Sequence, residues 1–319
     1  MLGGFAIWAN PSSPHGAGRK ARAALEDARD RIKAALGWDG EVIFTSSASE
    51  ALALGIGQSV LPLAAVSAVE HEAVLRHAGT ATLLPVDSSG LVRPADCAVP
   101  GLVAVQQANS ETGVVQPIEA LASAAHDAGG LLLADCAQGA GKLALPDADL
   151  IALSAHKFGG PVGIGALLVR DWAMLVPTGG QERGYRGGTE NLPGVLGMAA
   201  ALEADRDWLA TALVLRHRIN SAITAMGGEP LGEATARVPT IAAYRMPGRS
   251  ANAQLIRFDV KGIAVSAGSA CSSGSLRTSH VMEAIGYPHA AEVIRVSLGC
   301  ETTPEEVERF LAVWAEVAR

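Results

Sequence analysis

Short apolar runs of strand length alternate with helical stretches over the first two thirds of this chain. Between two of these runs, Pro117 opens a helical stretch that continues to about Ala128, and Gly129-Gly130 ends it. The alternation predicts an α/β fold with a mainly parallel sheet covered by helices. The apolar runs cover residues 41–45, 66–69, 102–106, 131–136, 149–153 and 164–169.

The pattern changes near Asp205. A long helical stretch follows, then apolar runs at 240–244 and 262–265, and helical stretches near 279–285 and 304–317. With 319 residues, 49% of them hydrophobic, the chain has material for one large core and a smaller one. We predict a large domain over residues 12–204 and a smaller α+β domain over residues 205–319, with residues 1–11 packed on the smaller domain.

The net charge and hydropathy of the chain limit the classes of molecule that we expect it to bind. The formal net charge is −7 and no run of Lys or Arg occurs, so we expect neither nucleic acid nor a membrane surface as a partner. The apolar stretch 52–69 is interrupted by Gly55, Gln58 and Pro62, and residues 1–10 lack the pattern of a secretion signal. We expect a cytoplasmic protein that acts on small molecules and other proteins.

The four cysteines are far apart and form no Cys-x-x-Cys pair, which argues against a structural zinc site or a disulfide framework. Cys136 and Cys300 have apolar neighbours and are expected to be buried, inert thiols, while Cys97 lies in a connecting segment. Cys271 differs, because it lies in the run of small residues 266–275, which would otherwise be a plain linker.

Two polar residues lie where the apolar runs end. Lys157 occupies a glycine-bounded loop between two runs, and burial would lower its pKa and make it a nucleophile for an aldehyde cofactor. Asp135 ends another run, at the edge where such sheets bind ligands, and can pair with the pyridine nitrogen of pyridoxal phosphate. Alone, each has an ordinary alternative, a solvated loop lysine and a turn residue. Together they favour a pyridoxal phosphate site.

A phosphate site is predicted where run 41–45 leads into Ser46-Ser47-Ala48-Ser49-Glu50 and a helix. Backbone N–H groups and the Ser49 hydroxyl would gather at that helix N-terminus. Taken alone, Ser49 and Glu50 would be interpreted as helix caps.

Several motifs follow one another along the chain: Val69-Glu70-His71-Glu72-Ala73-Val74, Glu111-Thr112-Gly113-Val114, residues 134–142 around Asp135 and Gln138, the Lys157 loop, residues 182–191, Gly268-Ser269-Ala270-Cys271-Ser272-Ser273, and Ile294-Arg295-Val296-Ser297-Leu298-Gly299. Through these motifs the chain, from about Asn10 to its C-terminus, resembles the pyridoxal-phosphate cysteine desulfurases, the NifS-type members of the class V aminotransferases. The resemblance implies the fold-type-I architecture of pyridoxal-phosphate-dependent transferases.

The resemblance implies a role for each matching residue. Lys157 would form the Schiff base, His71 would stack on the cofactor ring and move protons, and Cys271 would be the nucleophile. Asp135 would hold the pyridine nitrogen and Gln138 the phenolate oxygen. The remaining assignments are phosphate binding by Ala48, Ser49, Ser154 and His156, joined by Thr189 from the other subunit of a homodimer, and binding of the substrate carboxylate by Arg295.

The activity that the resemblance implies is conversion of L-cysteine to L-alanine, with a persulfide formed on Cys271. The form of the Cys271 loop is typical of relatives that pass sulfur to iron–sulfur scaffold proteins, and thiolation acceptors are also expected. Cys271 is a candidate transient ligand of an iron–sulfur cluster. We expect no other metal site. Two alternatives remain: a selenocysteine lyase, and a non-catalytic homologue that serves as a sulfur-transfer partner.

The chain also departs from the family pattern. Relatives usually carry a strand and an Ala-Thr-Thr-Pro turn well before the motif that begins at Asn10, whereas nine residues precede Asn10 here. The resemblance therefore suggests a shortened N-terminus or a misplaced start. Ser110 stands where relatives carry an asparagine near a cofactor oxygen, and Asn109 is our candidate to replace it.

Overall fold

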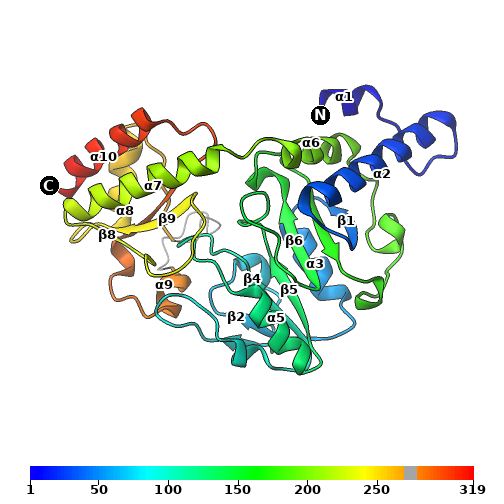
Figure 1. Ribbon diagram of the computed structural model, residues 1–319, viewed down its shortest axis with the longest axis horizontal. Helices are drawn as coiled ribbons and strands as arrows, with labels where there is room; N and C mark the ends of the chain where they lie inside the picture. The colour runs from blue at the N-terminus through cyan, green and yellow to red at the C-terminus, as the bar shows by residue number, and fades with distance from the viewer. Residues whose placement is uncertain (269–278) are drawn as a thin grey trace.

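The computed structural model describes residues 1–268 and 279–319, and its larger part is built on a seven-stranded sheet (Figure 1). The strand order is β1-β7-β6-β5-β4-β2-β3. Neighbours from β6 to β3 run parallel, while β7 is antiparallel to both β1 and β6. The mainly parallel sheet is therefore confirmed. The strands are β1 Glu41–Thr45, β2 Leu63–Ser67, β3 Thr82–Leu84, β4 Leu102–Gln106, β5 Leu131–Asp135, β6 Leu150–Ser154 and β7 Gly165–Val169.

Helices cover both faces of this sheet, because successive side chains of a strand point to opposite faces. In β4, Val103 and Val105 belong to the apolar cluster under α2, α5 and α6, while Leu102 and Ala104 belong to the cluster under α3 and α4. The helices of the larger part are α1 Leu2–Ala6, α2 Gly16–Leu36, α3 Ala48–Gln58, α4 Glu72–Leu75, α5 Ile118–Asp127 and α6 Leu192–Glu203, with short 3₁₀ helices η1 Pro94–Cys97, η2 Ala155–Lys157, η3 Trp172–Met174 and η4 Glu182–Gly184.

The C-terminal part has a three-stranded antiparallel sheet of order β10-β9-β8. Its core is aromatic: Phe258 stacks on Phe310, and both rings lie beside the buried Trp314. The break between α6 and α7, at residues 204–207, falls at the predicted domain boundary, and the division into two domains stays a prediction. The elements are α7 Trp208–Ala225, β8 Glu229–Pro230, β9 Ile241–Arg245, α8 Ala251–Val260, α9 His280–Ala284, η5 Ala290–Glu292, β10 Val293–Ser297 and α10 Pro304–Ala318.

Two expectations about these elements need correction. Residues 262–265 do not form a strand, since only Ser266 makes a bridge, to Arg295. The strand beside β9 is instead β10, which is only partly apolar because it carries Arg295 and Ser297. Residues 1–11 do not pack on the C-terminal part. Helix α1 lies against α6 (Figure 1), so closely that a Cβ on Gly4 would be 2.7 Å from the Pro193 Cα.

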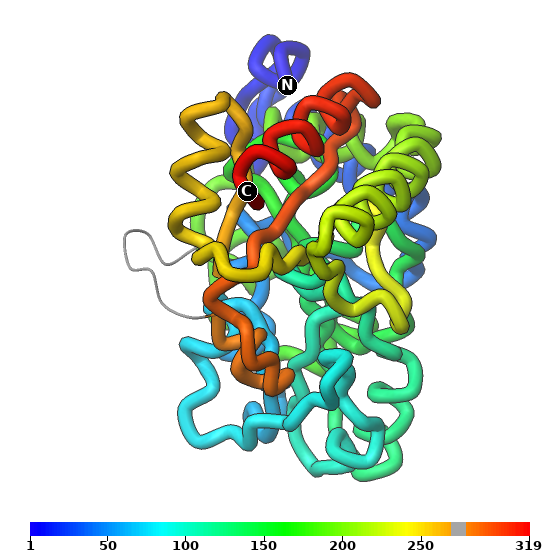
Figure 2. Tube along the Cα trace, turned by 90° about the vertical axis from the view of Figure 1, so that its left-hand side faces the viewer, coloured from blue at the N-terminus to red at the C-terminus, as the bar shows by residue number. Residues whose placement is uncertain are grey.

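Helix α9 joins the C-terminal part to the larger one. Val281 and Met282 of α9 share an apolar cluster with Val69, which follows β2. Figure 2 shows this stretch of chain, in orange, running beside the light-blue segment that follows β2. The described helices include none with both the length and the apolar character that a membrane span requires.

Candidate active site

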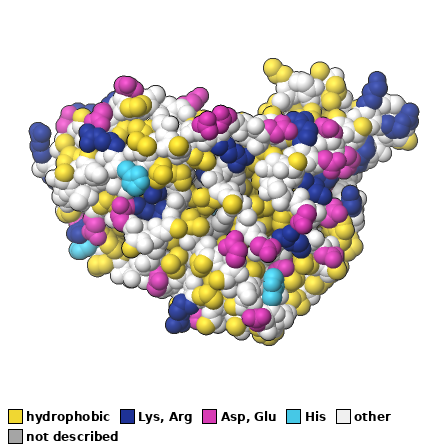
Figure 3. All heavy atoms as spheres, in the orientation of Figure 1, with side chains coloured by type: hydrophobic (Ala, Val, Ile, Leu, Met, Phe, Trp, Pro, Cys, Tyr) yellow, Lys and Arg dark blue, Asp and Glu magenta, His cyan; other side chains and the backbone are white. Residues whose placement is uncertain are grey.

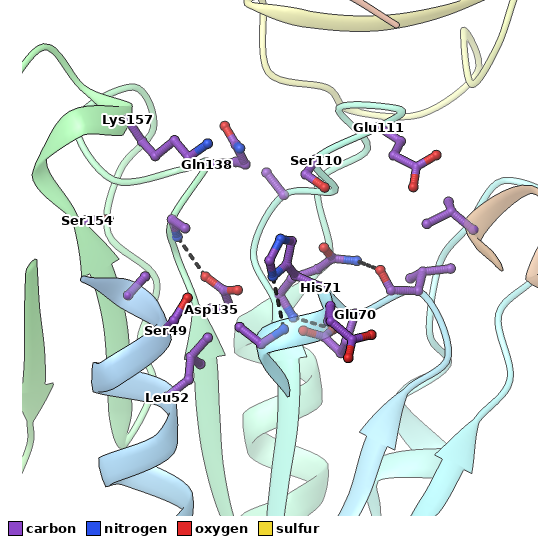
Figure 4. Close-up of a pocket in the computed structure, with 18 of the residues that line it drawn as sticks. Ser49, Leu52, Glu70, His71, Ser110, Glu111, Asp135, Gln138, Ser154 and Lys157 are labelled. Atoms are coloured by element: carbon purple, nitrogen blue, oxygen red, sulfur yellow. Dashed lines mark hydrogen bonds between the residues drawn. The ribbon is translucent and has the colours of Figure 1, made fainter. Parts of the chain in front are cut away.

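A cavity of about 220 Å³ opens at the carboxyl ends of the parallel strands (Figure 4), and residues of β10 and α9 also line it. The first turn of α3, the segment that follows β2, the end of β5 and the η2 helix each contribute side chains to its wall. The structure thus brings together nine of the residues singled out from the sequence: Ala48, Ser49, His71, Asp135, Gln138, Ser154, His156, Lys157 and Arg295.

One end of the cavity is suited to a phosphate group. Ser47 is the N-cap of α3 and accepts a hydrogen bond from the Glu50 amide at 3.3 Å. The amides of Ala48 and Ser49 belong to the first turn, where N–H groups have no partner within the helix and the helix dipole favours an anion. Opposite them, the Ser154 Oγ lies 3.1 Å from the His156 Nδ1. Backbone and hydroxyl donors therefore line the same cavity.

Asp135 ends β5 and is 7% exposed. Its Oδ1 accepts a hydrogen bond from the Ala137 amide at 2.9 Å. Burial raises the pKa of this carboxyl to about 6, against the opposing effects of the Ala137 amide and the Lys157 charge. A buried carboxyl of this kind gains from a nearby cationic N–H, which is what the ring nitrogen of pyridoxal phosphate offers.

We expect Asp135→Asn to stabilise the cofactor-free protein at neutral pH. The folded-state pKa of Asp135 lies above its ordinary value of 3.8, so the folded protein binds the extra proton and stability is lost as the pH rises from about 4 to about 6. Asparagine keeps the acceptor for Ala137 and carries no charge. The free energy of unfolding should rise by up to about 3 kcal/mol at pH 7. Urea denaturation at pH 4 and pH 7 checks this, and an equal effect at both values would contradict it.

His71 faces Asp135 across the cavity, above Glu70 (Figure 4). Its Nδ1 accepts a hydrogen bond from the Ala73 amide at 3.0 Å as the N-cap of α4, so the ring proton is on Nε2 in the neutral form. Burial, and then the Lys157 charge, lower the pKa of His71. A neutral imidazole is thereby favoured, which suits stacking on an aromatic ring and proton transfer through Nε2.

Lys157 lies on η2 and lines the cavity, but it is exposed, so the predicted burial is wrong. The short 3₁₀ helix places the side chain at the cavity rim. Lys142, the last residue of the 134–142 motif, is partly buried. Burial, helped by the Lys157 charge, lowers the pKa of Lys142 to about 8.

Lys142 also orients Gln138, because its Nζ donates to the Gln138 Oε1 at 3.3 Å. A lysine ammonium only donates, so it must face the oxygen of the side-chain amide. The NH₂ group of Gln138 is thereby left as the donor available to an oxygen acceptor in the cavity.

Of the predicted residues Arg295 and Asn109, only Arg295 lines the cavity. Arg295 lies on β10, lines the cavity and donates from Nη1 to the Ser110 carbonyl at 2.9 Å. Asn109 does not line the cavity, so its expected contact with the cofactor is corrected: its amide donates to the Val69 carbonyl and accepts from the Glu111 and Thr112 amides. Ser110 lines the cavity instead.

The remaining predicted residues lie elsewhere. Thr189 is exposed and does not line the cavity. Cys271 lies outside the described residues. Cys136 is buried as expected, but Cys300 is exposed, because it follows β10 in a surface loop. Within the described ranges, no group of three or more His, Cys, Asp or Glu side chains is arranged to hold a metal ion.

A second cavity, of about 500 Å³, adjoins the first between the two sheets. Both cavities are lined by Gln138, His156, Lys157 and Arg295, and the second is also lined by Lys142 and Arg206. The two cavities therefore have a wall in common, and Lys157 and Arg295 are part of that wall.

Comparison with known proteins defines the family. The model of the aminotransferase class-V family matches residues 6–310, so the chain belongs to this family. A cysteine desulfurase of Cereibacter sphaeroides is 38% identical to it over 337 residues, which cover 95% of this chain and 87% of the relative.

Solved structures agree with this assignment. A NifS-like protein from Rickettsia africae is 26% identical, with a TM-score of 0.88, and the match covers 99% of this chain and 93% of that one. A structure of SspA in complex with cysteine is 28% identical, with a TM-score of 0.78, and covers 95% of this chain and 96% of the other. The α/β architecture with a smaller C-terminal sheet is therefore that of NifS-like proteins.

Proposed function

We propose that this protein is a pyridoxal-phosphate-dependent cysteine desulfurase that converts L-cysteine to L-alanine and retains the sulfur as a persulfide on Cys271. The observation that carries the proposal is the convergence of Lys157, His71, Asp135 and Arg295 on one cavity that also has a phosphate-binding end. The cysteine desulfurase relatives named above support the choice of reaction.

The residues present fit the cofactor. The Ala48 and Ser49 amides, with Ser154 and His156, would hold the phosphate, and Asp135 would pair with the ring nitrogen. Gln138 would donate its NH₂ group to the phenolate oxygen, because Lys142 occupies the amide oxygen. Bound through Lys157, the cofactor supplies an electron sink for the bonds around the substrate Cα.

Three side chains of the protein would bind the substrate and transfer protons. Arg295 binds the substrate carboxylate, for which a planar guanidinium is the best-matched cation. Lys157 would move a proton at the substrate Cα, and the neutral His71 would move a second one through Nε2. Each of these three residues lines the same cavity.

Cys271 completes the reaction. Its thiolate forms a sulfur–sulfur bond with the substrate thiol sulfur, and the electron pair of the substrate carbon–sulfur bond stays with the carbon, which takes up a proton to give L-alanine. Sulfur leaves later, when an acceptor attacks the persulfide. We propose a protein acceptor, an iron–sulfur scaffold or a thiolation protein, and a cytoplasmic enzyme.

A homodimer is part of the proposal. Thr189 is exposed on its own subunit, which leaves it available to complete the phosphate site of a second copy. Apolar side chains lie on the surface over α1 (Figure 3), where Leu2 is 88% and Phe5 62% exposed. A second copy of the chain would cover side chains of this kind.

The test is to identify the products that the purified protein forms from L-cysteine after pyridoxal phosphate is added. We expect L-alanine to accumulate over many turnovers, with one sulfide per alanine when a reducing thiol is present. A keto acid in place of alanine would indicate transamination, and a colourless protein that the cofactor cannot reconstitute would indicate a non-catalytic partner. Faster turnover of L-selenocysteine, without need of Cys271, would indicate a selenocysteine lyase.

A further inference from the structure

The hydroxyl of Ser279 makes an unusually well-buried hydrogen bond across the two parts of the molecule. Ser279 Oγ donates to the Glu111 Oε2 at 2.6 Å, and the two residues are 6% and 5% exposed. Ser279 is also the N-cap of α9 and accepts from the Met282 amide at 3.1 Å. Ser279 is the first described residue after the segment 269–278 that carries Cys271. This bond therefore fixes the point at which that segment ends.

Glu111 is itself held firmly by the larger part. Its amide donates to the Asn109 Oδ1 at 2.9 Å, and the Asn109 amide group donates to the Val69 carbonyl at 3.1 Å. Burial raises the pKa of the Glu111 carboxyl, and the Ser279 hydroxyl and the charges of His280 and Arg295 oppose that effect. Removal of the Ser279 donor would leave this buried carboxyl without that hydrogen bond, which is costly in a poorly solvated position.

The other end of the segment meets the same place. Ser266 exchanges two backbone hydrogen bonds with Arg295, at 2.6 and 3.1 Å, and the Arg295 guanidinium donates to the Ser110 carbonyl beside Glu111. One small cavity is lined by Glu111, Gly268, Ser279 and Arg295 together. Both ends of the Cys271 segment thus converge on Arg295 and Glu111.

From this geometry we infer that Glu111 is a positioning residue, which acts through the Ser279 hydroxyl to hold the end of the Cys271 segment in register with Arg295. The inference rests on the proposed function for its meaning, since a persulfide forms only when Cys271 reaches the sulfur of a substrate whose carboxylate Arg295 holds. Glu111 needs no contact with substrate for this role. It deepens the account of the site by assigning a role to Glu111, to which the resemblance gave none.

The test compares Glu111→Leu, which removes the acceptor, with Glu111→Gln, which keeps one, and with Ser279→Ala, which removes the donor. Ser250→Ala is the matched control, because Ser250 also caps a helix, α8, through the Ala253 amide at 3.3 Å but has no bond to the larger part. Glu111→Leu and Ser279→Ala should each lower kcat about 10- to 100-fold with little change in KM. The double variant should be no worse than either single one, and Glu111→Gln and Ser250→Ala should stay near the parent.

A second readout does not need turnover. Relative to the parent protein, Glu111→Leu and Ser279→Ala should change the alkylation rate of the peptide that contains Cys271, and the change should be equally large in the two variants. The absorbance of the bound cofactor should stay at the parent value. Additive losses of kcat in the double variant, or one alkylation rate for all the proteins, would overturn the inference. If the parent forms no alanine the proposed function fails, whereas the alkylation comparison still decides the role of Glu111.

Discussion

Cys271→Ala should leave the protein yellow with bound cofactor and lower sulfide release from L-cysteine by at least about 1,000-fold, since the variant lacks the attacking nucleophile. The cavity residues that hold the cofactor are all supplied by other segments, so binding should be unaffected. Absorbance and sulfide assays on the same preparation measure both effects.

Cys300→Ala is the matched control for that experiment. Cys300 is the exposed cysteine among the described residues, whereas Cys97 and Cys136 are buried, and burial raises the pKa of both buried thiols. The control should keep the parent rate. Sulfide release at the parent rate by Cys271→Ala would mean that sulfur leaves without a persulfide on this residue.

Lys157→Ala should lose both the covalent bond to the cofactor and about 10²- to 10⁴-fold in turnover, the usual contribution of a positioned proton-transfer group. Lys157→Arg should be equally impaired, because a guanidinium keeps the charge but forms no Schiff base. Reduction of the loaded protein with borohydride, followed by peptide mapping, shows which lysine carries the cofactor.

Lys142→Met is the control variant that tests whether Lys157, and not Lys142, forms the covalent bond to the cofactor. Burial lowers the pKa of Lys142 to about 8, which favours its nucleophilic neutral form, whereas Lys157 is exposed. We expect Lys142→Met to keep the covalent bond, because Lys142 is already engaged with Gln138. Cofactor found on the Lys142 peptide of the parent protein would reverse the assignment.

Features that depend on local pattern were predictable from the sequence. Strands β1 and β4 begin and end at the expected residues, because their apolar runs are flanked by polar or glycine residues on both sides. The order of the motifs likewise placed Ala48, Asp135 and Lys157 at one edge of the sheet, since parallel strands bring their carboxyl ends together. In the structure these three residues line the same cavity.

Features that depend on distant contacts were not predictable. The burial of Lys142 is created by packing from other segments, and nothing in its neighbours reveals it. Asn109 seemed a substitute for a missing cofactor contact, but its amide is engaged with Val69, a partner 40 residues away. The Glu111–Ser279 bond spans 168 residues, a separation at which periodicity and spacing carry no signal.

The most direct test of the account is the mass of the peptide that contains Cys271 after one turnover of L-cysteine in the absence of a reducing thiol. We predict that this peptide gains the mass of one sulfur atom, that a thiol reductant removes it, and that one L-alanine forms for each sulfur retained. An unmodified Cys271 peptide accompanied by alanine formation would contradict the central claim that Cys271 takes the sulfur from the substrate.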